Sequence, residues 1–167
     1  MNFLLRLKHW QLFLLFALSV MLQTISHEIG FIFTFAILLG WTYSISIGIN
    51  NLLPPNLKHK TGFFEFNIGY AFIYIGLSRY LLQQEALLEI IIPFHIYAYY
   101  AIFYSFFFAA RQIRTFQNMR PTAFGECLSL IFLFWCSPIG LWFIQPQVNS
   151  IQEHCCPVNF QNKVRWL

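Results

Sequence analysis

Apolar side chains are gathered into five long stretches, separated by short polar connections. The stretches cover about residues 10–25, 31–49, 63–82, 86–110 and 127–144. Apolar runs of this length, with the charges mainly between them, are typical of helices that cross a bilayer. The pattern therefore predicts an all-α integral membrane helical bundle. Four transmembrane helices are expected, followed by a kinked or re-entrant fifth element.

The second stretch is the clearest span because it contains no charged residue. A helix over it is about 28 Å long, close to the roughly 30 Å thickness of the hydrocarbon region. Gly40, Ser44 and Gly48 recur every four residues, so they share one helix face and permit close packing by another helix. Gly69 and Gly76 in the third stretch provide a second face of this kind.

The first and fifth stretches each leave an alternative open. Residues 10–25 follow basic residues, as in a cleaved signal peptide, but another span comes directly afterwards and favours a retained helix. In residues 127–144, Pro138 and Gly140 interrupt the apolar run, which predicts either a kinked span or a re-entrant hairpin. The length of this run favours a fifth crossing. We expect one membrane domain over residues 1–151 and a polar tail over residues 152–167.

The composition agrees with a membrane protein. Apolar residues make up 58% of the 167-residue chain and charged residues 10%, against roughly 25% charged residues in soluble domains. The net charge of +4 raises nucleic acid as an alternative partner. The basic residues, however, lie in short clusters beside the apolar stretches, which favours anionic lipid headgroups. The expected partners are the lipid bilayer and other membrane helices, including copies of this chain, and no nucleic acid.

Lysine and arginine gather on one side of the predicted topology. If the first four stretches cross the membrane, one side receives Arg6, Lys8, Lys58, Lys60, Arg111, Arg114 and Arg120. The other side receives only Arg79 before the tail. The positive-inside rule then predicts a multi-pass protein of the cell (inner or plasma) membrane with a cytoplasmic N-terminus. Lys163 and Arg165 of the tail favour the hairpin, because only a hairpin returns them to the cytoplasmic side.

A candidate intramembrane polar site lies toward the outer face and consists of His95, Glu89, Glu85 and Arg79. His95 is about 13 Å below the outer end of its helix, and an ionisable side chain at that depth is a functional candidate. The structural alternative for His95 is a hydrogen bond to Tyr99 or to a neighbouring helix. For the two glutamates it is a solvated helix start, with the arginine in an interfacial ion pair.

Signatures of catalysis and of cofactor binding are missing. The chain contains no Gly-rich phosphate loop, G-x-S-x-G or H-E-x-x-H. His154, Cys155 and Cys156 form one soft-ligand cluster, but three consecutive side chains do not easily converge on a metal ion. We therefore expect no catalytic residue, no metal and no cofactor. The predicted function is that of a non-enzymatic accessory or interaction subunit that acts through helix packing. The alternative is a small-solute or proton-coupled carrier that uses His95 and the outer glutamates.

Four segments resemble an uncharacterised family of small bacterial multi-spanning membrane proteins. They are KHWQLFLLF (8–16), GWTYSISIGINNLLP (40–54), IPFHIYAYYAIFY (92–104) and PIGLWFIQPQVNSI (138–151). The last segment carries an I-Q-P-x-I/V-N ending at residues 144–149, and His95 matches a similarly placed histidine. The resemblance implies an integral cell-membrane location, supplies no activity, and does not extend past Ile151.

Overall fold

This computed structural model describes residues 7–82 and 88–155, and the only regular secondary structure in this part is α-helix. That part contains six helices and no strand, so the all-α class is confirmed. The helices are α2 (His9–Ile25), α3 (His27–Leu52), α4 (Gly62–Leu82), α5 (Leu88–Asn118), α6 (Phe124–Trp135) and α7 (Ser137–Cys155). Glu85 and the tail from Cys156 onward lie outside the described residues.

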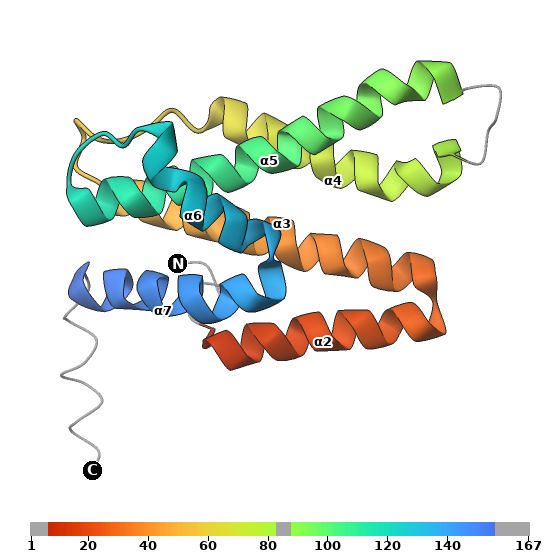
Figure 1. The fold of residues 1–167 in the computed structure, drawn as a ribbon, viewed down its shortest axis with the longest axis horizontal. Coiled ribbons are helices and arrows are strands. Elements are labelled where there is room, and N and C mark those ends of the chain that lie inside the picture. The colour runs from red at the N-terminus through yellow and green to blue at the C-terminus, as the bar shows by residue number, and fades with distance from the viewer. Residues whose placement is uncertain (1–6, 83–87, 156–167) are drawn as a thin grey trace, which may run out of the picture.

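The helices pair in chain order into three hairpins (Figure 1). The long hairpins α2–α3 and α4–α5 lie side by side, with α3 packed against both α4 and α5. The shorter α6–α7 hairpin covers one half of the bundle, where α6 packs on α5 and α7 packs on α2. We call "loop end" the end where residues 53–61 and 119–123 connect the hairpins. The "turn end" is the opposite one, where Ser26 joins α2 to α3.

Each of the first four predicted stretches forms one helix. α5 extends well beyond its predicted end at residue 110, because a helix can continue into polar sequence once backbone hydrogen bonds propagate it. In the described residues, His27–Leu52 and Glu89–Asn118 are long and apolar enough to cross a membrane, by length and composition. By the same measure, His9–Ile25 and Phe124–Trp135 are shorter apolar helices.

The fifth predicted stretch forms two helices that fold back on each other. Cys136 leaves helical geometry, with φ −84° and ψ 47°, and α7 begins at the next residue. Pro138 has no backbone N–H, and inside a continuous helix its ring would clash with the carbonyl four residues earlier. The 12 residues of α6 extend only about 18 Å. The structure therefore shows a helical hairpin here, and residues 127–144 do not form one continuous helix.

Two of the hairpin turns consist of a single residue. Ser26 alone separates α2 from α3, and Cys136 alone separates α6 from α7. Gly30 and Gly140, four residues after these turns, donate their N–H groups to the carbonyl of the turn residue at 3.0 and 2.9 Å. At either glycine a Cβ would collide with the backbone of the preceding helix. Glycine is therefore what lets the two arms of each hairpin approach so closely.

The centre of the core lies where α3, α5, α6 and α7 meet. Trp41 of α3 is fully buried and packs on Phe134 of α6, which stacks on Phe106 of α5. The indole Nε1 of Trp41 donates to Gln145 Oε1 of α7 at 2.8 Å. Gln145 Nε2 in turn donates to the carbonyl of Leu7 at 2.9 Å. The buried amide therefore satisfies the indole N–H and links three segments of the chain.

Candidate functional site

His95, the ionisable residue predicted deep in the membrane, lies half-buried on α5 where this helix meets α4. The Tyr74 hydroxyl of α4 is 2.8 Å from His95 Nδ1. Tyr99, one turn further along α5, packs edge-on against the imidazole with ring centroids 4.9 Å apart. Of the two structural alternatives for His95, the structure shows the hydrogen bond to a neighbouring helix.

His95 belongs to a row of polar contacts between α4 and α5. We call this row the polar seam, and it consists of Asn67, Tyr70, Tyr74, His95 and Tyr97. The Tyr97 hydroxyl donates to Asn67 Oδ1 at 3.2 Å, and the Tyr70 hydroxyl donates to the carbonyl just before His95 at 3.0 Å. The three members on α4 share one helix face because they are three or four residues apart. The seam therefore joins α4 to α5 over about two helical turns.

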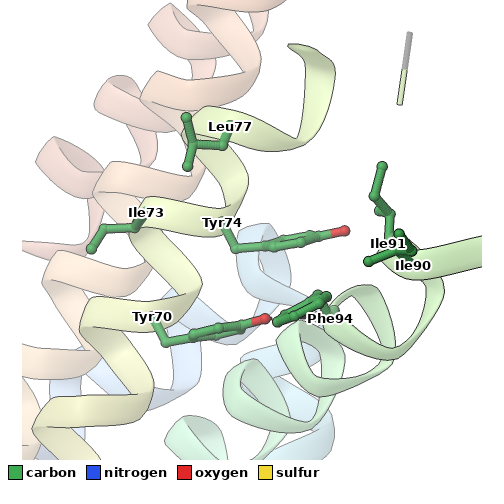
Figure 2. A pocket seen from close by; sticks show the side chains of 7 residues that line it. All are labelled: Tyr70, Ile73, Tyr74, Leu77, Ile90, Ile91 and Phe94. Atoms are coloured by element: carbon green, nitrogen blue, oxygen red, sulfur yellow. Dashed lines mark hydrogen bonds between the residues drawn. The ribbon is translucent and has the colours of Figure 1, made fainter. Parts of the chain in front are cut away.

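Two cavities flank Tyr74. The larger has a volume of about 350 Å³ and is lined by Tyr70, Ile73, Tyr74, Leu77, Ile90, Ile91 and Phe94. Figure 2 shows Tyr70 and Tyr74 extending from α4 across this space toward α5. The smaller cavity, about 80 Å³, lies between α3, α4 and α5, and His95 and Ser78 contribute polar groups to a mostly apolar and aromatic wall. Cavities with such walls suit apolar groups and offer little to a hydrated ion.

Of the other residues in the predicted intramembrane polar site, Glu89 lies apart from the polar seam. Glu89 is exposed in the first turn of α5, where its charge suits the helix dipole. Glu89 and His95 are six residues apart, so their side chains lie on different sides of α5. The side chain of Arg79 and the whole of Glu85 lie outside the described residues.

The predicted packing face of α3 is used inside the chain. Ser44 is buried, and Gly40 and Gly48 are half-buried, on a helix that contacts α2, α4, α5 and α7. Gly69 and Gly76 of α4 are exposed instead, and a Cβ at either position would meet nothing within 4 Å. A small-residue face open to another chain therefore lies on α4.

Four residues that make these contacts are not identified in the sequence analysis, although each leaves a signal there. Asn67, Tyr70 and Tyr74 follow an i, i+3, i+7 spacing, which places three hydrogen-bonding side chains on one face of an otherwise apolar helix. Gln145 is a polar residue directly after an apolar run, and its burial becomes evident only once α7 turns back toward α3.

Comparison of the chain with protein-family models, curated proteins and solved structures found no match. The function is therefore inferred from the geometry of the helices and their surfaces.

Proposed function

We propose that this chain is a non-enzymatic, multi-pass protein of the cell membrane that acts as an accessory or interaction subunit by packing against other membrane helices. In this proposal α2, α3, α4 and α5 cross the bilayer, and the α6–α7 hairpin enters from the loop end and returns to it. The positive-inside rule places the loop end in the cytoplasm, because it carries Lys58, Lys60, Arg111, Arg114 and Arg120. The resemblance to small bacterial multi-spanning membrane proteins points to the same location.

The outer surface of the helices supports membrane embedding. In the most apolar parts of α3 and α5, only 44% and 28% of the residues are buried. An apolar helix in the core of a soluble protein is buried on most sides, so these faces need another apolar environment. Met21 of α2, Ile73 of α4 and Phe132 of α6 continue this surface, each more than 60% exposed. The 17 residues of α2 and the 21 of α4 extend about 25 and 31 Å, comparable with a bilayer.

The open glycine face of α4 is the observation that carries the interaction role. Gly69 and Gly76 are about two turns apart, and Phe66, Ile73 and Tyr80 beside them are 61%, 63% and 67% exposed. A glycine inside a helix costs about 1 kcal/mol relative to alanine, and lipid chains gain nothing from its missing side chain. A neighbouring helix does gain, because its backbone can approach closely. We therefore place a membrane helix of another chain, or of a second copy, on this face.

Leucine substitutions on α4 test the interaction role. Gly69→Leu and Gly76→Leu add bulk to this face at positions where a Cβ meets nothing within 4 Å. Both variants are therefore expected to fold and to lose the complex that co-purifies in gentle detergent. The measurement is a pull-down with identification of the recovered proteins, together with the mass of the complex. Gly125→Leu is the matched control, because Gly125 is equally open but lies on α6. A complex that survives both α4 substitutions, or a wild-type chain that purifies alone as a monomer, contradicts the proposal.

The carrier alternative rests on a single observation, namely that His95 lines the smaller cavity between α3, α4 and α5. Transport requires polar groups along a path, whereas the wall of this cavity is mostly apolar and aromatic. His95→Ala and Glu89→Gln distinguish the two functions. A carrier loses a flux in these variants, whereas an interaction subunit keeps both its partner and every flux.

A further inference from the structure

Buried polar atoms without a partner are concentrated at one place in the described part of the chain. They are His59 Nδ1, Arg111 Nε, Arg114 Nε, and both amide atoms of Gln112. Three of these residues lie within two turns of α5, and the fourth lies in the α3–α4 connection at the same loop end. An unpaired buried polar group costs about 1–3 kcal/mol. Gln112 is fully buried on a different side of α5 from Arg114. The unpaired atoms of His59, Arg111 and Arg114 therefore indicate a binding partner that the described residues do not supply.

The position of Arg111 on α5 indicates where this cluster lies relative to the bilayer. It is half-buried, and no side-chain hydrogen bond or ion pair joins it to another described residue. The uncharged stretch of α5 directly before it, Ile90–Ala110, is about 31 Å long, which matches the roughly 30 Å of bilayer hydrocarbon. In the topology proposed above, the guanidinium therefore lies at the cytoplasmic boundary, where the phosphates of the lipids begin.

His59 is held in place at the same boundary. The Asn50 side chain accepts a hydrogen bond from His59 N at 2.9 Å and donates one to His59 O at 3.1 Å. The imidazole stands edge-on to Phe108, with centroids 6.4 Å apart. Burial, and then the nearby Arg111 guanidinium, lower the pKa of His59 below its usual value. The imidazole is therefore neutral near pH 7 and lies close enough to Arg111 to be affected by its charge. Asn50 holds the main chain that carries it.

The charges around the cluster favour a negatively charged ligand. Arg114 donates two hydrogen bonds, from Nη1 to Gln117 Oε1 and from Nη2 to Ser129 Oγ, both at 3.2 Å. The carboxylate of the nearby Glu126 forms an ion pair with Arg120 at 3.1 Å. Lys58 and Lys60 are exposed beside His59. The cluster thus combines positive charge with unpaired guanidinium N–H donors, those of Arg111 Nε and Arg114 Nε. A phosphate group supplies both the negative charge and the acceptor oxygens.

We propose that Arg111, together with His59 and Arg114, binds the phosphate of an anionic phospholipid headgroup at the loop end. The inference rests on the membrane topology proposed above. α6, which carries the Ser129 partner of Arg114, exposes a row of apolar side chains for the acyl chains, namely Phe124, Leu128 and Phe132. A free phosphate ester shares the same chemistry, and a separate arm of the experiment distinguishes it from the lipid.

Thermal unfolding of the full-length protein in neutral detergent provides the test. Phosphatidylglycerol is expected to stabilise the protein at concentrations where phosphatidylcholine, which has a phosphate but no net charge, does not. Arg111→Gln is expected to raise the half-saturating phosphatidylglycerol concentration about tenfold, since it removes a charge-assisted hydrogen-bond donor. Arg120→Gln is the control, because it removes the same charge from the same end at an exposed residue that is already paired.

Gln112→Leu separates the proposed site from the buried amide beside it. It removes both unpartnered amide atoms on another side of α5, so it is expected to stabilise the lipid-free protein and to leave the shift that phosphatidylglycerol produces unchanged. Equal weakening by Arg111→Gln and Arg120→Gln, or equal stabilisation by the two lipids, overturns the inference. A stronger effect of inorganic phosphate than of phosphatidylglycerol, abolished by Arg111→Gln, retains the phosphate site and overturns the lipid as its source.

The lipid experiment and the α4 experiment fail independently. A protein that keeps its helix partner but binds no anionic lipid contradicts only the site around Arg111. A protein that binds phosphatidylglycerol through Arg111 but forms no complex through Gly69 and Gly76 contradicts only the interaction role.

Discussion

Two pairs of polar side chains inside the bundle join different helices, and each pair fixes one place where helices meet. Trp41 and Gln145 join α3 to α7, and Tyr74 and His95 join α4 to α5. In an apolar solvent an unpaired polar group finds no water, so separating such a pair is costly. Measured net gains per interhelical hydrogen bond are nevertheless only about 0.6 kcal/mol. The pairs therefore determine which helix faces meet more than they determine the total stability.

Gln145→Leu is expected to lower the free energy of unfolding by about 1–3 kcal/mol, because the indole N–H of Trp41 loses its buried acceptor. Denaturant or thermal unfolding in detergent micelles measures this loss. Gln147→Leu is the control two residues along α7, since Gln147 is only half-buried and bonds an exposed Gln117. Adding Trp41→Phe to Gln145→Leu removes the donor as well and should recover part of the loss. A Gln145→Leu variant as stable as wild type contradicts the role of the amide.

The sequence identifies His95 but not its partner, and the reason is physical. An ionisable residue within an apolar run is visible from the sequence alone, because the run itself defines the depth. The partner depends on how α4 is rotated about its axis against α5, and that rotation is set by packing along the whole interface. The same limit applies to Arg111, whose charge is evident in the sequence although its unpaired Nε and the buried Gln112 beside it are not.

At the scale of elements, the hairpins are defined by their turns. Ser26 and Cys136 each leave a single residue between two helices, so the helices that follow must pass directly against those that precede. Gly30 and Gly140 occupy the point of closest approach, where a side chain would meet backbone atoms. Backbone cannot move aside as the end of a flexible side chain can, so these two positions tolerate substitution worse than the exposed glycines of α4.

Gly140→Ala and Gly30→Ala are each expected to destabilise the protein by about 1–3 kcal/mol, the usual cost of overpacking a close contact. At Gly140 the added Cβ meets the carbonyl of Leu133 in α6. Gly69→Ala is the matched control, expected to be neutral or to stabilise by up to about 1 kcal/mol, because alanine is the better helix former and the site is open. Unfolding midpoints in detergent measure all three. Equal effects at Gly140 and Gly69 contradict the close approach of α6 and α7.

Hydrophobic runs predict where helices lie more reliably than how they are connected. The first four runs correspond to α2, α3, α4 and α5, because each is bounded by charges or by turn residues. The break in the fifth run is visible at Pro138, but the length of the run does not say whether the chain continues or turns back. That choice depends on contacts between α6 and α7, which a one-dimensional pattern does not contain.

At the scale of the whole molecule, the three hairpins give the bundle two unlike ends. The loop end collects Lys58, Lys60 and the arginines of α5, whereas the turn end carries exposed Glu28 and Glu89. Because α6 and α7 fold back, α7 ends on the loop-end side of the bundle (Figure 1). Lys163 and Arg165 of the tail lie outside the described residues. A return of the chain to the loop end nevertheless fits their positive charge better than a fifth crossing.

Cysteine labelling tests this topology. In a variant whose four native cysteines are replaced by serine, Ser150→Cys in α7 and Asn56→Cys in the α3–α4 connection are expected to react with a membrane-impermeant maleimide from the same side. His27→Cys at the turn end is expected to react from the opposite side. All three positions are exposed in the structure, so a difference in labelling reports the side of the membrane rather than burial. Intact cells and inside-out vesicles supply the two sides. Labelling of Ser150→Cys together with His27→Cys means that the α6–α7 segment crosses the bilayer. The tail would then be external, and the fold-back hairpin could not be the membrane topology.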